Sequence, residues 1–435
     1  FHTMCGILFS YNSDNFSDLE MLKRRGPEGF TEQTNDLGYF AHSMLNTIGE
    51  NTPQPYQTKN GMLLYNGSTY NSGLDNDTEW IGKRLDDNVG NTVDVVKELN
   101  GEYALIYVTE KNVVFCVDHF DNRNLWFYHD QDKRELTIAS VPNIIQQKHG
   151  RSWRAEGNKI YVMDRHNFSI KVETNKIFNL DQKTNHFDHV FENFEQAVRS
   201  RYNPLHSTAL LSSGFDSGVV NCAIQKMFDQ VDCVSDPAGE IITTLKERTK
   251  LHKAVILLNH QGHHEEKEKM FHDILPRDDL WDDPSVNPLI NIMKNYVKRR
   301  KKKVVLFGQG GDEVYNDWHE QAMGFKWTRT NGSFPQSLQL VWPWHNHNRQ
   351  MQLTNTRIDF IMGYFGLESR NPMLDVNLVQ AWINTSCDLK NKGNKSWMKA
   401  YMDQEKYPYT MTKVHWSYNE YKAQPWKLTN KNDLQ

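Results

Sequence analysis

A short stretch near the middle of the chain combines hydroxyl, glycine and carboxylate residues directly after an apolar run. The run is Ala209–Leu211, and it is followed by Ser212, Ser213, Gly214, Asp216 and Ser217. We expect a buried strand, a tight turn and a helix N-terminus, which together direct backbone N–H groups and the positive end of the helix dipole at one place. Such a place binds anions, and a carboxylate beside a phosphate implies Mg²⁺ between them. The alternative is an ordinary turn in which Asp216 or Ser217 caps the helix.

A second stretch of this kind follows another apolar run. Val304–Phe307 is expected to be a buried strand, and Gly308, Gln309, Gly310 and Asp312 come after it. Backbone N–H groups can approach a phosphate closely where no side chain intrudes, and the carboxylate can bind Mg²⁺. A glycine-rich turn is weak evidence alone, so its weight depends on the first stretch.

A third candidate for chemistry lies near the N-terminus. Residues 1–3 look like the remnant of an added extension, so Met4 is the expected natural start and Cys5 would become the first residue after methionine removal. A thiol beside a free α-amine is a nucleophile–base pair, because an amine with a pKa of about 8 can take the thiol proton. The alternative is a small buried cysteine at the start of a strand.

Length and composition limit the kind of protein. A chain of 435 residues is too long for one ordinary core, so two domains are expected. The net charge of −4 gives no indication of nucleic-acid or membrane partners, and no stretch approaches the roughly 20 apolar residues of a membrane helix. The five scattered cysteines lack metal-binding spacing and fit a cytoplasmic location. The composition leaves a homodimer open.

The pattern of apolar residues changes along the chain. We place a domain boundary near Asp181, where a polar segment separates weakly alternating strands from a predicted amphipathic helix at His186–Arg201. Further strands are expected at Cys233–Val234 and Ala254–Leu258. Strands that alternate with helices predict a parallel sheet whose ligands bind at the carboxyl ends of its strands.

The second part of the chain resembles the ATP-pyrophosphatase ligases, and asparagine synthetases in particular. The first loop is similar to Ser-Gly-Gly-x-Asp-Ser, with Ser213 in place of the second residue. The second loop is similar to Ser-Gly-Glu-Gly-x-Asp-Glu, with Phe307 and Gln309 as departures. Gly366–Asp375 resembles the family pattern Gly-x-Glu-x-Arg-x-Pro-Phe-Leu-Asp, in which Glu368 and Arg370 either pair with each other or contact substrate.

The synthetase resemblance implies a site for ATP and its metal. Asp216 and Asp312 would bind Mg²⁺ (Mg2+), and Lys413 would neutralise charge on the leaving pyrophosphate, unless it is only a solvated lysine. The family places a candidate base where Gln309 stands, and glutamine cannot accept a proton. The residues expected to bind ATP or pyrophosphate are Ser212, Ser213, Gly214, Asp216, Ser217, Gly308, Gln309, Gly310 and Asp312.

The first part resembles class II glutamine amidotransferases, which use an N-terminal nucleophile (Ntn hydrolases). The matching segments are Arg25–Glu28, Asn66–Asn71, Asn76–Glu79, Gly101–Tyr107, Asp118–Asp121 and Thr137–Ser140. The resemblance implies that Cys5 attacks the glutamine side-chain amide and that Asn66 and the Gly67 N–H form the oxyanion hole. It also implies that Asp77 binds the α-ammonium group of glutamine.

Two departures put glutamine binding in question. Met44 stands where the family carries the arginine that binds the α-carboxylate, and Ser68 stands where it carries a glutamate. Loss of a bidentate arginine contact removes about 1.5–3 kcal/mol of charged hydrogen bonding. Either another cation replaces it, or glutamine binds weakly, or the ammonia has another source.

Taken together, these features predict an α/β protein in two parts. Residues 4–181 would form an N-terminal α/β/β/α sandwich of antiparallel sheets, and residues 182–435 a C-terminal doubly wound parallel α/β domain. The predicted function is an ATP-dependent, glutamine-dependent carbon–nitrogen ligase that adenylates a carboxylate, with L-aspartate as first candidate, and yields asparagine, AMP, pyrophosphate and glutamate. The resemblance alone implies that ammonia passes between the sites inside the protein.

Two alternatives remain. A related ligase with another acceptor would account for Met44, Ser68 and Gln309. Several tryptophans could then stack a larger substrate, although they are core residues by default; they are Trp318, Trp327, Trp342, Trp344 and Trp416. The other alternative is a non-catalytic nucleotide-binding homologue.

Overall fold

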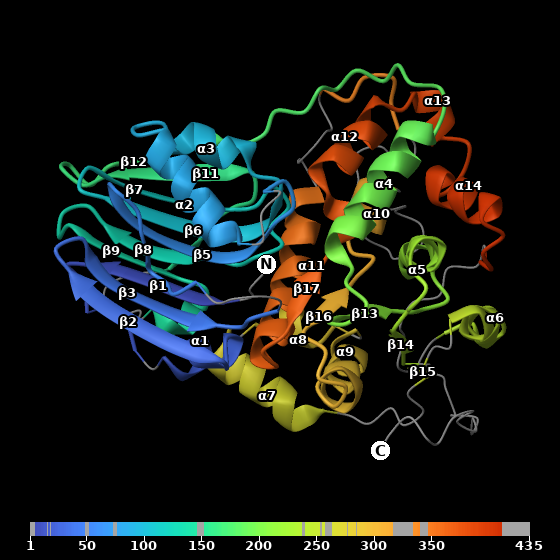
Figure 1. The fold of residues 1–435 in the computed structure, drawn as a ribbon, viewed down its shortest axis with the longest axis horizontal. Coiled ribbons are helices and arrows are strands. Elements are labelled where there is room, and N and C mark those ends of the chain that lie inside the picture. The colour runs from blue at the N-terminus through green and yellow to red at the C-terminus, as the bar shows by residue number, and fades with distance from the viewer. Residues whose placement is uncertain are drawn as a thin grey trace. The chain divides into compact units, whose positions relative to one another are not determined.

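The computed structural model describes thirteen stretches of the chain. They are residues 5–14, 16–17, 19–47, 52–72, 76–145, 152–236, 240–252, 255–256, 263–275, 277–283, 285–315, 334–339 and 347–410. The chain divides into two compact units (Figure 1). The first comprises Phe1–Leu180, Lys269–Arg277 and Gln339–Ser369, and the second comprises Asp181–Glu268, Asp278–Leu338 and Arg370–Gln435. No helix in the described part is long and apolar enough to span a bilayer.

The first unit contains two six-stranded antiparallel sheets. One sheet has the order β10-β8-β9-β1-β3-β2 and the other the order β12-β11-β7-β6-β5-β4. The strands of the former are β1 (Gly6–Tyr11), β2 (Gly29–Asn35), β3 (Gly38–Met44), β8 (Trp126–Asp130), β9 (Glu135–Ala139) and β10 (Trp153–Arg154). Those of the latter are β4 (Tyr56–Gln57), β5 (Gly61–Thr69), β6 (Gly101–Thr109), β7 (Asn112–Val117), β11 (Lys159–Asp164) and β12 (Ile170–Thr174).

Helices cover the two sheets and complete a four-layer arrangement. Aromatic and branched side chains such as Phe9, Ile106 and Phe115 form the core between the sheets. Helices α2 (Asp77–Asp87) and α3 (Thr92–Glu98) bury apolar side chains against the second sheet. Helix α1 (Glu20–Arg25) packs against β1 and β3, and α11 (His347–Tyr364) packs against α1. The predicted α/β/β/α sandwich of antiparallel sheets is therefore confirmed.

The second unit is built on a five-stranded sheet with the order β15-β14-β13-β16-β17. Its strands are β13 (Ser207–Leu210), β14 (Cys233–Ser235), β15 (Val255–Ile256), β16 (Val304–Leu306) and β17 (Glu368–Arg370), at whose end the chain enters the unit. Strand β13 pairs in parallel with β14 and β16, and β14 pairs in parallel with β15. The chain moves outward from β13 to β15 and then returns to β16 on the other side of β13. This is the predicted doubly wound order, which reverses between β13 and β16.

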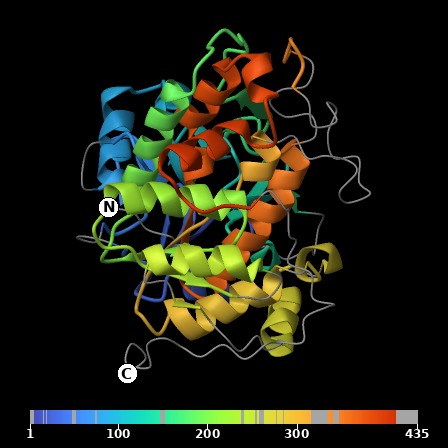
Figure 2. The same cartoon turned by 90° about the vertical axis from the view of Figure 1, so that its right-hand side faces the viewer.

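The helices that lie wholly or partly in the second unit precede, connect or follow these strands. They are α4 (Asp188–Arg201), α5 (Phe215–Met227), α6 (Ile242–His252), α7 (His264–Asp273), α8 (Asp278–Trp281), α9 (Val286–Ile292), α10 (Gly311–Tyr315), α12 (Val376–Asn384), α13 (Cys387–Lys390) and α14 (Ser396–Gln404). The second unit also contains the short helical segments η2 (Met293–Val297) and η4 (Pro372–Leu374), and the first unit contains η1 (Pro142–Ile144). Helices α5 and α6 run nearly parallel, end-on in Figure 1 and lengthwise in Figure 2.

Several elements predicted from sequence occur in this unit. The amphipathic helix is α4, whose buried face includes Val190, Phe194 and Val198. The Phe194 ring packs edge-on against the Trp397 ring, with the ring centroids 5.0 Å apart. Phe194 is therefore a core residue. Of the strand predicted at residues 254–258, only the part that forms β15 lies within the described residues.

Burial of His42 in β3 predicts a pH dependence for the first unit. Burial lowers the pKa of this imidazole to about 3, against about 6.5 in an unfolded chain. The unfolded state therefore binds more protons below pH 6.5, and stability falls as the pH falls from 6.5 towards 3 by up to about 1.4 kcal/mol per pH unit. Hydrogen exchange of the β3 amides, corrected for intrinsic rates, should show this slope in the wild type and a flatter slope in His42→Gln. Equal slopes would contradict it.

Candidate active sites

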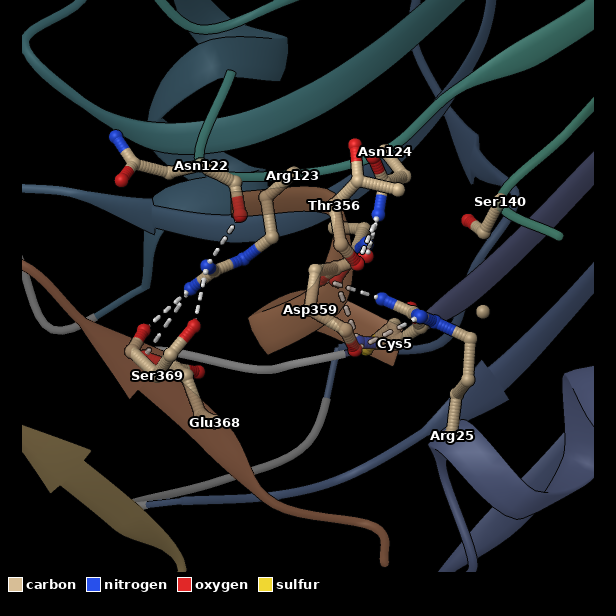
Figure 3. Close-up of polar contacts among 12 residues, drawn as sticks. Cys5, Arg25, Asn122, Arg123, Asn124, Ser140, Thr356, Asp359, Glu368 and Ser369 are labelled. Atoms are coloured by element: carbon tan, nitrogen blue, oxygen red, sulfur yellow. Dashed lines mark hydrogen bonds and ion pairs between the residues drawn. The ribbon is translucent and has the colours of Figure 1, made fainter. Parts of the chain in front are cut away.

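Cys5 lies directly before β1 in the first unit, and its side chain is fully buried. Its backbone N–H donates to Asn66 Oδ1 at 2.7 Å, and Arg25 Nε donates to its carbonyl oxygen at 3.3 Å. The next two backbone N–H groups donate to Ser43 Oγ at 2.9 Å and to Ser140 Oγ at 3.1 Å. Figure 3 shows Cys5 and Arg25 close together in this part of the unit. Four side chains thus fix the backbone around the cysteine.

Asn66 and Gly67 lie beside Cys5 because β5 carries them there. Since Asn66 Oδ1 accepts from the Cys5 N–H, the amide group is oriented, and its buried Nδ2 has no hydrogen-bond partner among the described residues. An unpaired buried donor beside a thiol is what an oxyanion hole requires. Gly67 has a φ of 131°, and a Cβ there would overlap the carbonyl oxygen of Glu102. Only glycine fits this position.

Asp77 is the first residue of α2 and is buried. Its Oδ2 accepts a hydrogen bond from the Thr69 N–H at 2.9 Å, at the end of β5. The preceding residue, Asn76, caps the helix by accepting from the Glu79 N–H at 3.0 Å. Asp77 therefore joins β5 to α2, and its contact with the α-ammonium group of glutamine stays a prediction.

A buried charged cluster lies where the sequence departs from the amidotransferase pattern. Ser68 Oγ donates to Glu368 Oε1 at 2.9 Å, and Arg123 Nη2 lies 4.0 Å from the same oxygen. The guanidinium also lies 3.9 Å from Glu102 Oε2. It donates to the backbone oxygen of Ser369 at 2.9 Å (Figure 3). A carboxylate is thus present beside Ser68, but β17 supplies it from far along the sequence.

In the second unit, the serines of the loop after β13 hydrogen bond within the loop and to a nearby carboxylate. The Ser212 N–H donates to Ser217 Oγ at 2.9 Å, and the Gly214 N–H donates to Ser212 Oγ at 3.1 Å. Ser213 Oγ donates to Glu240 Oε2 at 2.5 Å. Ser213 is not among the residues with positive φ, so this position does not require the glycine of the family pattern.

A buried arginine of α6 also supports this loop. Arg248 Nη1 donates to the carbonyl oxygens of Ser212 at 2.5 Å and Gly214 at 2.9 Å. Its guanidinium lies 5.2 Å from the centroid of the Tyr407 ring. A Cβ at Gly218 would overlap the guanidinium, so the glycine makes room for it. No motif surrounds Arg248, so this residue has no signal in the sequence alone.

The glycine-rich turn after β16 packs directly against Asp216. A Cβ at Gly308 would lie 2.5 Å from the backbone carbon of Asp216, and one at Gly311 would overlap its carboxylate. Gly310 has a φ of 92°, and a Cβ there would overlap Leu374. Since β13 and β16 are parallel neighbours where the strand order reverses, both predicted loops meet at the place where such folds bind ligands.

Lys395 joins the two aspartates of these loops. Its Nζ lies 2.5 Å from Asp216 Oδ1 and 2.7 Å from Asp312 Oδ1, and the side chain is almost completely buried. Burial alone would lower the pKa of Lys395, but the two carboxylates outweigh it and raise the pKa. Sequence reasoning missed this lysine because it lies in the polar segment Asn391–Lys395, which is typical of a solvated loop.

The donor set at this place fits Mg²⁺ only with help from a ligand. Asp216 and Asp312 both reach one cation, and Mg²⁺ is commonly held by one or two carboxylates together with phosphate oxygens. Within the described stretches, no group of three or more His, Cys, Asp or Glu could hold a metal ion. Metal binding here would therefore require the oxygens of a bound phosphate group.

A neighbouring carboxyl group titrates near neutral pH. Burial, followed by the charge of Asp312, raises the pKa of Glu313 to about 7. Gln309 Nε2 lies 3.4 Å from Glu313 Oε1 and donates to it. Gln309 cannot accept a proton, but the Glu313 carboxyl beside it can. The sequence alone contains no indication that Glu313 is a site residue.

Some predicted site residues fall in parts of the chain that are not described. Lys413 lies outside the described residues, so its phosphate-binding role stays a prediction. The same holds for the tryptophans considered as substrate contacts, which are Trp318, Trp327, Trp342, Trp344 and Trp416.

Comparisons with known proteins add little to this geometry. No family model matches the chain, and no curated protein matches it. The chain is similar to the glutamine phosphoribosylpyrophosphate (PRPP) amidotransferase from B. subtilis complexed with ADP and GMP, at 13% identity and a TM-score of 0.32, over 53% of this chain and 65% of that one. It is also similar to the allosteric regulatory enzyme of purine biosynthesis, at 14% identity and a TM-score of 0.33, over 58% of this chain and 80% of that one. The chain thus spans slightly less than two thirds of the length of the first protein.

The turn after β16 can be tested by adding one methyl group. Gly310→Ala places a Cβ against Leu374 at a positive φ, which should destabilise the second unit by about 1–3 kcal/mol. Gly393→Ala is the matched control, because a Cβ there meets nothing within 4 Å. Hydrogen exchange of the β16 and α5 amides measures the change. Equal protection in both variants would show that the turn tolerates a side chain.

Proposed function

We propose that the chain is an ATP-dependent amide-forming ligase, with a glutamine-hydrolysing site in the first unit and an adenylating site in the second. The observation that carries the proposal is the meeting of Asp216 and Asp312 at Lys395. Each aspartate follows a loop of small residues after one of two neighbouring parallel strands. Such loops offer N–H groups and hydroxyls to phosphates, and two carboxylates can bind Mg²⁺. ATP with Mg²⁺ is therefore the proposed ligand of this site.

The proposed first step in the second unit is adenylation. A carboxylate oxygen of the acceptor attacks the α-phosphorus of ATP, and the bond from that phosphorus to the pyrophosphate oxygen breaks. Bound Mg²⁺, held by Asp216, Asp312 and phosphate oxygens, would neutralise negative charge on the leaving group. Lys395 would turn from the aspartates to the pyrophosphate, with Lys413 as a second cation. L-Aspartate is the first candidate acceptor, from the resemblance of the motifs.

The proposed reaction in the first unit releases ammonia from glutamine. In a chain that begins at Cys5, the α-amine takes the thiol proton and the thiolate attacks the side-chain amide carbon. The amine returns that proton to the amide nitrogen, ammonia leaves, and water hydrolyses the resulting thioester to glutamate and the free thiol. Asn66 Nδ2, the buried donor without a partner in the described residues, would bind the oxyanion together with the Gly67 N–H. Asp77 would bind the substrate's α-ammonium group.

The proposed last step joins the two products. Ammonia attacks the acyl carbon of the adenylate, AMP leaves, and the nitrogen gives up a proton. Glu313 is the candidate base for that proton, because its pKa is raised to about 7. With aspartate as acceptor, the overall products are asparagine, AMP, pyrophosphate and glutamate.

A related ligase with another acceptor is the second candidate. The observation that favours it is the replacement of the family glutamate by the pair Ser68 and Glu368, which changes the side chains next to the oxyanion hole. An exchange assay with ATP, Mg²⁺, labelled pyrophosphate and a panel of acids separates the candidates. Exchange that requires aspartate supports the first, exchange with another acid supports the second, and no exchange with any acid indicates a non-catalytic nucleotide-binding protein.

Removal of either aspartate should abolish adenylation. Asp216→Ala and Asp312→Ala each remove a proposed Mg²⁺ ligand without removing core volume, so ATP–pyrophosphate exchange should fall to background while the protein stays folded. Asp388→Ala, an exposed aspartate of α13, is the control and should keep normal exchange. Near-normal exchange in both site variants would refute the assignment of the nucleotide site.

The two reactions should respond separately to loss of the thiol. Cys5→Ala should lose glutamine-dependent product formation and keep ammonia-dependent product formation, because the adenylating site does not use the thiol. Cys116→Ala, a buried cysteine of β7, is the matched control and should keep both. Product amounts with each nitrogen donor are the measurement, and equal loss with both donors would contradict the separation of the sites.

The residues before Cys5 should block glutamine hydrolysis. With Phe1–Met4 in place, the Cys5 nitrogen is a peptide nitrogen and cannot act as a base. General-base assistance contributes about 10²–10⁴-fold, so this form should release glutamate at least about a hundredfold more slowly than a chain that begins at Cys5. Ammonia-dependent synthesis should be equal in the two forms. Matching rates of glutamate release would mean that Cys5 is not an N-terminal nucleophile.

A further inference from the structure

An ion pair connects the backbone of Cys5 to a helix far along the sequence. Arg25 Nη2 lies 2.9 Å from Asp359 Oδ1, and Arg25 Nη1 donates to the Asp359 backbone oxygen at 3.4 Å. The Nε of the same guanidinium donates to the Cys5 carbonyl oxygen. Both charged side chains are almost completely buried. One rigid guanidinium therefore links the predicted nucleophile to α11 (Figure 3).

Asp359 is itself fixed from the other side. Asn124 Nδ2 donates to Asp359 Oδ2 at 2.8 Å and to the Thr356 carbonyl oxygen at 3.3 Å. Asn124 Oδ1 accepts from Arg154 Nη2 at 3.0 Å, and Arg154 Nη1 lies 2.9 Å from Asp121 Oδ1. Both oxygens of the Asp359 carboxylate thus have fixed donors, and charged and polar groups alternate from Arg25 to Asp121.

We propose that Asp359 is a positioning residue for the Cys5 nucleophile and acts through Arg25. This proposal rests on the proposed glutamine hydrolysis. Cys5 lies before the first residue of β1, so side chains hold its backbone, with Asn66 at the N–H and Arg25 at the carbonyl oxygen. If the guanidinium loses its anion, it is free to turn, and the thiol moves relative to Asn66 Nδ2. A displacement of about 1 Å at a reacting centre can cost about 10²-fold in rate.

The same contacts bring a helix from a distant part of the sequence to the proposed glutamine site. Helix α11 belongs to the first unit, although it follows most of the second unit in sequence. An ion pair that only stabilises the fold needs no contact with the site. The Arg25 guanidinium, however, also donates to the carbonyl oxygen of the predicted nucleophile, Cys5. The glutamine site therefore requires residues 347–364 as well as the first 180 residues of the chain.

The test compares two variants in a full-length chain that begins at Cys5. Asp359→Asn keeps the shape of the side chain and removes its charge, so kcat for glutamine hydrolysis should fall about 10²-fold while KM changes little. Arg25→Met combined with Asp359→Leu removes both charges, and apolar replacement of a buried ion pair often preserves folding. This double variant should show the same fall in kcat with normal ATP–pyrophosphate exchange.

Asn355→Ala is the matched control, because Asn355 lies one turn earlier on α11 and donates to the Phe120 carbonyl oxygen at 2.7 Å without contacting Arg25. It should keep kcat within about twofold of the wild type. Iodoacetamide labelling followed by mass spectrometry reports on folding, since all five cysteines are buried and a loosened fold would expose more of them. The number of labelled cysteines should be the same in the wild type and all variants.

The outcomes separate this proposal from the proposed function. Normal kcat in either folded variant overturns the positioning role while glutamine hydrolysis stands. An equal fall in Asn355→Ala also overturns it, because α11 would then act only by holding the unit together, and so does a fall in kcat that appears only with increased cysteine labelling. A wild-type chain that releases no glutamate refutes the proposed function, and the positioning role with it.

Discussion

Two carboxylates held around one ammonium group are the interaction on which the second unit depends. Asp216 and Asp312 would repel each other without a cation between them, and Lys395 supplies that cation. Its backbone adopts a left-handed conformation, with a φ of 50°, at the residue before α14. That conformation costs about 1–2 kcal/mol, which two charge-assisted hydrogen bonds offset. The parallel pairing of β13 and β16 brings the two loops together, and glycines at positions 308 and 311 allow them to touch.

In the first unit, side chains likewise hold the backbone in place, here at Cys5, directly before β1. A residue that precedes a strand lacks the backbone partners that the strand interior has, so other groups must hold it. At Cys5 these groups are Asn66 and Arg25, and each has a second feature. Asn66 Nδ2 has no hydrogen-bond partner among the described residues, and Arg25 forms an ion pair with Asp359. In both units, polar side chains from distant parts of the chain fix the backbone where the proposed chemistry takes place.

The sequence predicted the elements whose signals are local. Apolar runs before glycine and serine residues marked β13 and β16, and a helical period marked α4. The parallel α/β unit followed from such patterns, whereas the α/β/β/α sandwich was predicted from the resemblance to class II glutamine amidotransferases. The contacts that complete the sites have no local signal, because Lys395 and Asp359 reach their partners only after the chain has folded. For the same reason the carboxylate beside Ser68 could not be foreseen from the segment around it.

In the proposed reaction, nitrogen from glutamine enters an amide whose formation consumes ATP. The most direct measurement supplies a chain that begins at Cys5 with glutamine labelled with ¹⁵N in its side-chain amide, together with ATP, Mg²⁺ and L-aspartate. We expect ¹⁵N in the amide of the product, with one AMP and one pyrophosphate formed for each amide. Release of labelled ammonia with no labelled amide and no AMP, for aspartate and for every other acid tested, would contradict it.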